Sequence, residues 1–392
     1  MISVDEALAK VLALATAPRP ETVTLAQARR RVLLEPAVAR LTQPPFDASA
    51  MDGYAMRAED IALPLQVVGT SAAGHPWQGK AAQGTAIRIF TGAPVPQGFD
   101  HVELQENVLR DGDTIRVQTR SRGSNIRARG NDFTKGDAIA PGRVLNAADI
   151  GLLAAMNIPE VTVAARPRVA ILAGGDELVR PGEDVGPGQI VSSNDLAIAA
   201  LVEDAGGTPQ ILPIARDTEE SLHAAFRAAK GADLLVTIGG ASVGDHDLIG
   251  KVAAEAGMTR AFYKIAMRPG KPLMAGSMGP LAMLGLPGNP VSAMVCAMIF
   301  MQPLIRRMQG FADVARTETA RLGVDLGPEG PRQHYLRARL ATVDGALTVT
   351  PFADQDSARL SIMAEADALL LRPAHDPERA QGSQVQIVRI NR

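Results

Sequence analysis

The spacing of hydrophobic and polar positions changes several times along the chain, and each change predicts a different kind of element. Apolar residues recur at helical spacing over 3–15, 24–33 and 145–158, which predicts three helices. Between about 46 and 136, short apolar runs such as LPLQVVG and TIRVQT alternate with Gly, Pro and Asp turns. That pattern is typical of a small β-rich domain, here interrupting a helical segment.

After Pro167 the pattern alternates between buried strands and helices. Such alternation predicts a parallel, doubly wound α/β sheet. Asn194 or Asp195 is expected to cap one helix, and Asp217 is expected to start another. The segment 290–308 is expected to form a long final helix with Pro290 in its first turn. Apolar runs beyond about 320 predict a small C-terminal β domain. The expected strands of the α/β sheet are 168–175, 209–215, 233–240, 260–266 and 281–288.

The 392 residues exceed what one hydrophobic core usually supports, and the changes of pattern divide them into four predicted domains. A discontinuous helical linking domain comprises 1–45 and 137–165, and a β-rich domain comprising 46–136 is inserted into it. An α/β domain follows over 166–310, and a C-terminal β domain over 311–392. The predicted fold class is therefore multidomain α/β plus β.

Composition and charge narrow the classes of function. The formal net charge is −2 and no long basic run occurs, which argues against nucleic acid or a membrane surface as the main partner. The single cysteine, Cys296, rules out an intrachain disulfide framework and fits a reducing compartment. The apolar run 291–305 is too short for a bilayer and is expected to end at Pro303. These features predict a soluble, cytoplasmic protein.

Acidic segments follow three of the predicted strands, where an open parallel sheet gathers its ligands. GGDEL follows the first strand, Asp217 the second, and GGASVGDHD the third. Magnesium prefers such oxygen ligands and often bridges phosphates, and the glycines let backbone amides approach an oxyanion. The candidate side chains of these segments are Asp176, Glu177, Asp217, Ser242, Asp245 and Asp247.

Cations and an acidic turn complete the candidate chemistry. KIAMRPGKP supplies Lys264, Arg268 and Lys271, which could hold an anion, and LPGNP follows the next strand. PPFDASAMDGYAMR, which opens the β-rich block, places Asp52 among small residues that leave room for a ligand. Each segment also has a structural alternative. Asp217 could cap a helix, the glycines could form turns, the cations could be a solvated face, and Asp52 could belong to an acidic turn.

Taken together, these segments resemble the molybdopterin molybdenumtransferase family, which includes the bacterial MoeA proteins and the E domain of gephyrin. The matching motifs occur in the family's order over roughly residues 1–310, and jointly they are highly specific. The matching motifs are FDASAMDGYAMR, RIFTGAPVPQG, SNIRARGNDFTKGD, GDEL, GGASVGDHD, KIAMRPGKP and LPGNPVSA.

The resemblance implies an elongated homodimer of four-domain subunits. Its α/β domain is expected to be similar to molybdopterin adenylyltransferase (MogA-like), and its C-terminal domain to be a β-barrel. The active cleft is expected to combine the α/β domain with the β-rich domain of the other subunit. The implied reaction inserts molybdate into adenylylated molybdopterin and cleaves the adenylate with the help of magnesium, releasing AMP and molybdenum cofactor. Tungstate has the same anion geometry, so the choice of oxyanion stays open.

Carried over position by position, the resemblance also implies a set of site residues. The expected catalytic residues are Asp52, Asp132, Glu177, Asp217 and Asp247. The expected magnesium ligands among them are Asp217, Asp247 and Glu177. Arg268 departs from bacterial relatives that carry lysine there, which changes a point charge into a forked donor. The expected substrate-binding residues are Thr91, Ser242, Lys264, Arg268, Lys271, Pro287, Pro290, Arg332, Arg337 and Ser357.

Two alternative functions are retained. The first is the adenylyltransferase step itself, because residues 166–310 resemble that enzyme, although the β-rich block argues against it. The second is a scaffold, because gephyrin clusters receptors through a related domain. Further candidate partners are the molybdopterin adenylyltransferase and maturation factors of molybdoenzymes.

Overall fold

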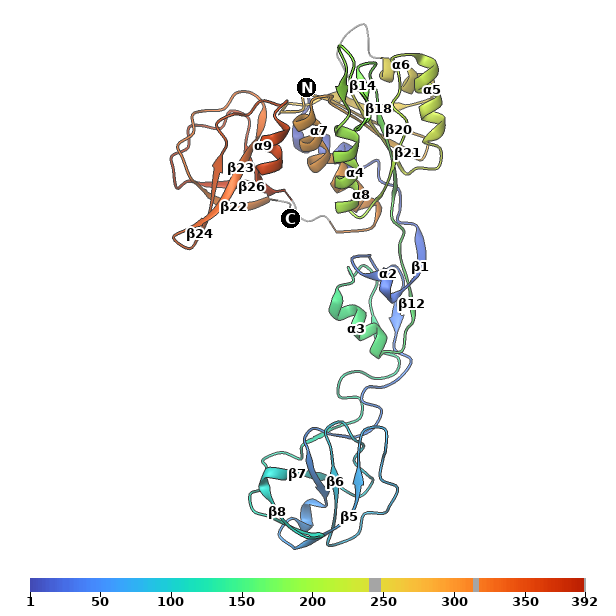
Figure 1. Ribbon diagram of the computed structural model, residues 1–392, viewed down its shortest axis with the longest axis vertical. Coiled ribbons are helices and arrows are strands. Elements are labelled where there is room, and N and C mark those ends of the chain that lie inside the picture. Colours follow the sequence, from blue (N-terminus) through green and yellow to red (C-terminus); the bar gives the residue numbers. More distant parts are fainter. Residues whose placement is uncertain (240–247, 313–316, 391–392) are drawn as a thin grey trace. The chain divides into compact units, whose positions relative to one another are not determined.

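The structure is a computed structural model that describes residues 1–239, 248–312 and 317–390. It contains two compact units (Figure 1). The first comprises Met1–Glu21 with Ala164–Arg392, and the second comprises Thr22–Val163. The finer boundaries of the four domains stay a prediction.

The first unit is built on a six-stranded sheet of mixed direction. Its strands are β13 (Arg168–Ala173), β16 (Thr208–Ile211), β17 (Leu234–Ile238), β18 (Thr259–Lys264), β20 (Pro272–Met278) and β21 (Leu281–Leu286). They lie in the order β16-β13-β17-β21-β20-β18. β16, β13, β17 and β21 are parallel, whereas β20 is antiparallel to both of its neighbours. β18 therefore runs in the same direction as the four parallel strands.

The predicted parallel, doubly wound sheet is present, but the prediction missed its antiparallel strand, β20. The chain turns directly from β20 into β21 as a hairpin, with Met278 paired to Leu281. Gly279, with φ of 57°, supplies the left-handed turn that the hairpin needs. Because antiparallel strands need only a short turn, no crossover helix marks this pair in the sequence.

Helices cover both faces of the sheet because successive strand residues point to opposite sides. The helices are α1 (Val4–Leu12), α4 (Asn194–Asp204), α5 (Glu219–Ala228), α6 (Leu248–Glu255), α7 (Pro290–Cys296) and α8 (Gln302–Met308). Val169 and Ile171 of β13 face a core shared with α1, α4, α7 and α8. Ala170 and Leu172 face a core shared with α5 and α6. Figure 1 shows α5 and α6 on the side of the sheet opposite to α4, α7 and α8.

The start of α4 differs slightly from its prediction. The residue ahead of the helix is Ser193, and its side chain makes no capping bond. Asp195, one of the two predicted caps, is instead buried and forms an ion pair with Arg180. Ser192 Oγ donates a further hydrogen bond to this carboxylate at 3.0 Å.

The last helical run of the α/β part continues from Pro290 to Met308 through a π-helical turn, Ala297–Met301. The long final helix predicted over 290–308 is confirmed, whereas the apolar run does not end at Pro303, which lies inside this helix. The π-helical turn lies just ahead of this proline, whose missing N–H disturbs regular helical bonding. Among the described residues, this helix is the one long and apolar enough to cross a membrane by length and composition. Of the apolar stretch of this helix, 78% is buried inside the structure, as in a core helix.

The C-terminal part of the first unit is a closed β-barrel, as predicted. Its strands are β22 (Thr317–Leu322), β23 (Gln333–Val343), β24 (Ala346–Pro351), β25 (Ala368–Arg372) and β26 (Gln384–Arg389). They pair in the order β23-β24-β22-β26-β25, and β25 pairs again with β23, which closes the ring. The short strand β19 (Met267–Arg268) adds to β23, and α9 (Leu360–Glu365) follows β24. The unit also contains the two-stranded ladder of β14 (Leu178–Val179) and β15 (Ile190–Val191).

The second unit is β-rich, as predicted. Its sheet has the order β7-β4-β6-β5-β9-β8, with β4 (Gly53–Met56), β5 (Leu65–Ser71), β6 (Thr85–Ile89), β7 (His101–Leu104), β8 (Val108–Asp111) and β9 (Thr114–Val117). A separate core combines residues from 23–39 with residues from 133–163, including α3 (Ala147–Ala155). Short ladders pair β1 (Pro20–Thr24) with β12 (Glu160–Ala164), β2 (Ala37–Val38) with β11 (Ala138–Ile139), and β3 (Ala48–Ser49) with β10 (Ile126–Arg127).

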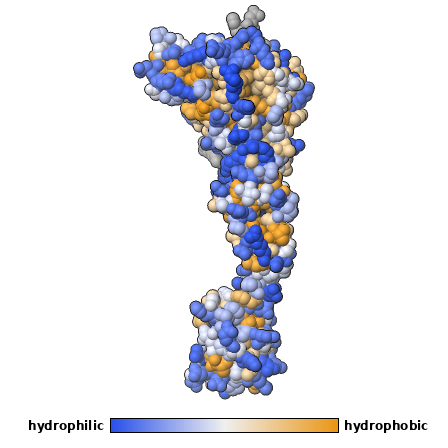
Figure 2. Space-filling view, turned by 90° about the vertical axis from the view of Figure 1, so that its right-hand side faces the viewer, coloured by the Kyte–Doolittle hydropathy of each residue, from blue (hydrophilic) through white to orange (hydrophobic). Residues whose placement is uncertain are grey.

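The helix predicted over 24–33 is much shorter in the structure. Only α2 (Leu25–Ala28) is helical. Arg29 is extended and Arg30 has φ of 63°, so the chain turns away after one helical turn. Apolar residues also reach the surface on the side of the chain that Figure 2 shows. In the second unit, the exposed large apolar side chains include Phe46, Met51 and Phe90.

Candidate active site

The carboxyl edge of the sheet brings two acidic segments together. The Gly175 N–H donates to the Ala215 carbonyl at 3.0 Å, which ties the loop after β13 to the segment after β16. The Asp217 N–H donates to Oδ1 of Asp176 at 3.2 Å. Asp176, Glu177 and Asp217 are all exposed at this edge. The predicted meeting of the GGDEL segment and Asp217 is therefore present.

Asp217 does not cap the helix that follows it. Thr218 is the capping residue of α5, and its Oγ1 accepts a bond from the Ser221 N–H at 3.3 Å. The cap thus lies one residue after Asp217 and α5 begins at Glu219, so the capping alternative for Asp217 was wrong. The guanidinium of Arg216 donates to the Asp176 carbonyl at 3.0 Å. Sequence reasoning missed this cation beside the two carboxylates.

The third acidic segment follows β17, and all of it after Gly239 lies outside the described residues. Ser242, Asp245 and Asp247 lie outside the described residues. Within the described ranges, no group of three or more His, Cys, Asp or Glu side chains is arranged to hold a metal ion. The Gly239 N–H donates to the Leu286 carbonyl at 3.2 Å. The chain therefore leaves β17 beside the LPGNP loop.

The basic segment KIAMRPGKP lies at the same edge of the sheet. Lys264 ends β18, which runs in the direction of the parallel strands, and Lys271 precedes β20. Gly270 has φ of 108°, and a Cβ there would lie 2.4 Å from the Cys296 sulfur, so the loop packs directly on α7. Arg268 and Lys271 are exposed. The loop therefore places two exposed cations near the end of β18.

The LPGNP loop contacts the barrel through Ser357. The Val291 N–H donates to the Ser357 carbonyl at 3.2 Å, and the Asn289 amide donates to Ser357 Oγ, also at 3.2 Å. Pro287 is buried, whereas Pro290 occupies the first turn of α7. The predicted proline pair and Ser357 are thus brought together in the first unit.

The two arginines predicted in the barrel differ in their surroundings. Arg337 is 1% exposed and donates to the carbonyls of Asp356 and Arg359, so it holds the loop that carries Ser357. Arg332 lies close to the buried His334. Burial lowers the pKa of His334, its bond to Glu329 raises it, and the positive charges of Arg268 and Arg332 lower it further. Arg268 and Arg332 therefore contribute to one positive region, in which sequence reasoning missed His334.

In the second unit, Asp52 and Thr91 form a hydrogen-bonded pair. Oδ1 of Asp52 accepts bonds from the Thr91 N–H and from Thr91 Oγ1, both at 2.8 Å. These two bonds, with the charge of Arg88, outweigh partial desolvation and hold the pKa of Asp52 below its ordinary value. Because Asp52 is exposed, its fixed and ionised carboxylate is also accessible.

The other acids of this unit have separate places. Asp132 is exposed, and its backbone N–H donates to the Gln43 carbonyl at 3.1 Å. Asp47 accepts a bond from the Arg129 N–H at 2.8 Å, so it ties two distant segments together. Of the two acids in the turn, Asp52 is therefore the one whose carboxylate binds a predicted substrate-binding residue, Thr91.

A buried carboxylate, Glu103, supports the strand next to Asp52. It bonds to the His101 ring at 3.0 Å, to the Asn107 amide at 2.7 Å, and to both the N–H and the hydroxyl of Ser121. Burial opposes its ionisation, but these hydrogen bonds outweigh it and lower the pKa to about 2. A Cβ at Gly53 would lie 1.9 Å from the Glu103 carbonyl oxygen, so the Gly after Asp52 permits this close approach.

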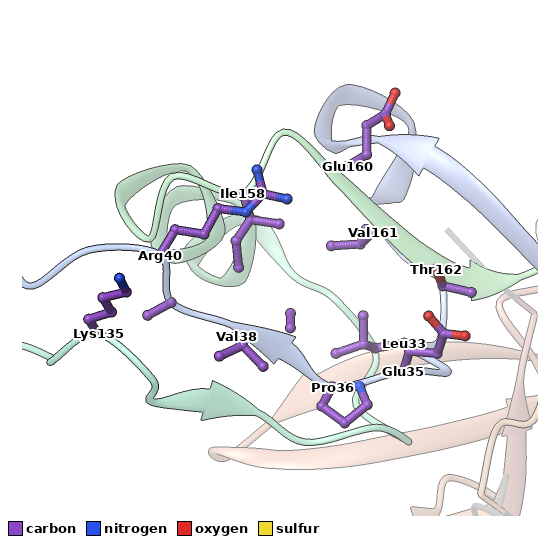
Figure 3. A pocket seen from close by; sticks show the side chains of 12 residues that line it. Leu33, Glu35, Pro36, Val38, Arg40, Lys135, Ile158, Glu160, Val161 and Thr162 are labelled. Carbon is purple, nitrogen blue, oxygen red and sulfur yellow. The ribbon is translucent and has the colours of Figure 1, made fainter.

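A hollow of about 550 Å³ lies elsewhere in the second unit. Figure 3 shows Arg40 and Lys135 on one side of it and Glu35 and Glu160 toward the other. Its apolar lining residues include Val38, Ile158 and Val161. None of the predicted site residues lines this hollow.

Comparisons with family models match three regions of the chain. Residues 2–157 match the "MoeA N-terminal region (domain I and II)". Residues 170–307 match the "Probable molybdopterin binding domain", and residues 319–390 match the "MoeA C-terminal region (domain IV)".

Relatives and a solved structure match nearly the whole chain. The molybdopterin molybdenumtransferase of Nostoc sp. is 35% identical over 387 residues, covering 94% of this chain and 88% of the relative. Molybdopterin molybdenumtransferase 2 of Mycobacterium tuberculosis is 36% identical over 404 residues, covering 99% of each. The crystal structure of the molybdopterin biosynthesis MoeA protein of Pyrococcus horikoshii matches with a TM-score of 0.85 at 29% identity, covering 100% of both chains. The chain therefore belongs to the molybdopterin molybdenumtransferase family and is a transferase of molybdenum cofactor biosynthesis.

Proposed function

We propose that this transferase inserts molybdate into adenylylated molybdopterin and cleaves the adenylate, releasing AMP and molybdenum cofactor. The observation that carries this proposal is that acidic and basic segments both lie along the carboxyl edge of one sheet, the acidic ones after β13 and β16 and the basic one after β18. Asp176 and Asp217 are joined there by a hydrogen bond, and Lys264 ends a strand at the same edge. Both molybdate and the adenylate phosphate are anions, so the cations can bind and orient them.

The carboxylates at this edge supply the oxygen donors that magnesium prefers, and the described residues include two of the three proposed ligands, Glu177 and Asp217. Magnesium is usually held by one or two carboxylates together with substrate phosphates, so a dedicated cage of three acids is not required. Glu177 and Asp217 would hold the ion, with Asp247 as a further ligand outside the described residues. When bound, magnesium would neutralise phosphate charge and polarise the linkage that is cleaved.

The protein's own residues would position the substrate around this centre. Lys264, Arg268 and Lys271 would hold the anionic groups. The loop from Pro287 to Pro290, braced by Ser357, would form one wall of the site. A water molecule supplies the oxygen that AMP gains when its linkage to molybdopterin breaks. Ser242 and Arg332 stay proposed substrate contacts.

The acids of the β-rich unit would act on the same reaction in a homodimer. The family resemblance implies that Asp52, Thr91 and Asp132 serve the cleft of the partner subunit. The fixed, ionised carboxylate of Asp52 supports a role in orienting the substrate rather than in proton donation.

The proposal is tested by incubating the pure protein with adenylylated molybdopterin, magnesium and either molybdate or tungstate, and following AMP. We expect AMP release that depends on the oxyanion and needs no ATP. If the protein instead consumes ATP in the presence of molybdopterin, the adenylyltransferase alternative replaces the proposal. Tight, stoichiometric binding of a protein partner without turnover would favour the scaffold alternative.

A further inference from the structure

One arginine holds the turn that carries Asp52, and no role in the proposed reaction has yet been given to it. Arg88 lies in β6, opposite Tyr54 of β4. Its Nη1 donates to the Gly53 carbonyl at 2.9 Å, and its Nη2 donates to Oε1 of Gln105. The Gln105 N–H in turn donates to the Asp52 carbonyl at 3.1 Å. Arg88, Gln105 and the Asp52–Gly53 backbone therefore form a closed ring of hydrogen bonds.

Two aromatic rings fix the guanidinium that closes this ring. The central carbon of the Arg88 guanidinium lies 5.2 Å from the centre of the Tyr54 ring and 4.7 Å from the centre of the Phe90 ring. Both distances are within the range of cation–π attraction. Phe90 directly precedes Thr91, whose N–H and hydroxyl bind the Asp52 carboxylate. The same arginine thus contacts the segments on both sides of the Asp52–Thr91 pair.

The charge of Arg88 is not cancelled by the oxygens that it binds. Both of them, the Gly53 carbonyl and the Gln105 amide, are neutral acceptors. The positive charge therefore acts on the nearby Asp52 carboxylate, where it adds to the two bonds from Thr91 in lowering the pKa. A lysine would keep the charge, but its compact ammonium lacks the planar fork that binds two acceptors between stacked rings.

We propose that Arg88 is a positioning residue for Asp52: its guanidinium clamps the Asp52–Gly53 backbone to Gln105 so that the carboxylate is presented in one orientation. The part of this inference that concerns substrate rests on the proposed function. The clamp itself is a property of the free protein and can be tested without substrate.

Amide hydrogen exchange at Thr91 and Gln105 reports the clamp directly. In Arg88→Met and Arg88→Lys, we expect both amides to exchange about tenfold faster, because a bond from a charged donor is lost in each. Arg116→Met, in β9 of the same sheet, serves as the matched control and leaves both rates unchanged. Fluorescence of Trp77, the single tryptophan, checks that each variant is folded. Unchanged exchange in Arg88→Lys would overturn the clamp and leave charge alone as the role of this residue.

AMP release then tests what the clamp does for the reaction. We expect kcat to fall about tenfold in both Arg88 variants while KM for adenylylated molybdopterin changes little, as for misorientation of a bound substrate. Faster exchange combined with wild-type kcat would overturn a role in the reaction. If the wild-type protein releases no AMP, the proposed function fails, whereas the exchange rates still decide whether the clamp exists.

Discussion

The two units hold their candidate carboxylates in opposite ways. In the second unit, Asp52 receives two hydrogen bonds from Thr91 and its turn is clamped by Arg88. At the sheet edge of the first unit, Asp217 is exposed and the described contact is made by its backbone, which donates to Asp176. The first carboxylate is oriented before any ligand arrives. The second is available to a ligand or metal ion.

On the proposed function, this difference assigns the two acids different tasks. Oδ1 of Asp52 already accepts two hydrogen bonds from Thr91. A carboxylate held in this way is suited to orienting a substrate group with its other oxygen. An exposed carboxylate near a glycine-rich strand end is suited to a hard cation that bridges phosphates. The comparison therefore predicts different consequences when each acid is removed.

Removing Asp217 should have the largest effect. In Asp217→Ala, we expect AMP release to fall by about 10²–10³-fold, because a proposed ligand of the magnesium ion that neutralises phosphate charge is lost. Asp247→Ala is expected to behave in the same way. The measurement is molybdate-dependent AMP release, with Glu220→Ala on α5 as the matched exposed control. Normal release by both variants would remove the metal–carboxylate interpretation.

Removing the charge of Asp52 should have a smaller effect. Asp52→Asn keeps the shape of the side chain but removes its charge. Its NH2 group either faces the Thr91 donors or, with the amide flipped, points away from them. We expect AMP release to fall about tenfold to a hundredfold, as for a misplaced substrate. Added magnesium should not restore the activity of Asp52→Asn, whereas it should partly restore that of Asp217→Ala, which lacks a proposed metal ligand. Rescue of Asp52→Asn by magnesium would erase the contrast between the two acids.

Replacing Glu103 should affect stability rather than chemistry. In Glu103→Gln, an amide group must face donors from His101, Asn107 or Ser121, so we expect a loss of about 2 kcal/mol in the free energy of unfolding of the second unit. Trp77 belongs to this unit and reports its unfolding. Glu106→Gln is the matched control, since Glu106 is exposed.

The same variant tests a pH dependence. Because the pKa of Glu103 is lowered from 4.5 to about 2 in the folded protein, its stabilisation is complete above pH 4.5 and is lost as the pH falls toward about 2. Glu103→Gln should lack this component of the acid transition. An identical pH dependence in both proteins would contradict the assignment.

The smallest expected effect concerns the hydroxyl of Thr91. Thr91→Val removes one of the two bonds to Asp52 and leaves the backbone N–H in place. The pKa of Asp52 should therefore rise part of the way toward its ordinary value of 3.8. Carboxyl NMR titration measures this shift, with Thr70→Val in β5 as the control. No shift would mean that the hydroxyl does not bind the carboxylate in solution.

The sequence alone predicted features that follow from topology. The ends of parallel strands meet at one edge, so the order of strands and helices along the chain is enough to place GGDEL and Asp217 together. Features that depend on register could not be predicted in this way. Arg88 reaches Gly53 and Gln105 only because β6 pairs with β4, and β4 with β7. Neighbouring cap-forming residues also leave a helix start uncertain by one position, as Asp217 and Thr218 show.

The central claim is that the two kinds of carboxylate serve one reaction from different subunits of a homodimer. It is tested most directly by exchanging subunits between Asp52→Asn and Asp217→Ala and measuring AMP release. Random exchange makes about half of the dimers mixed, and each mixed dimer then holds one intact pair of acids. The account predicts recovery to about a quarter of the wild-type rate. No recovery in a mixture shown to contain mixed dimers would contradict it.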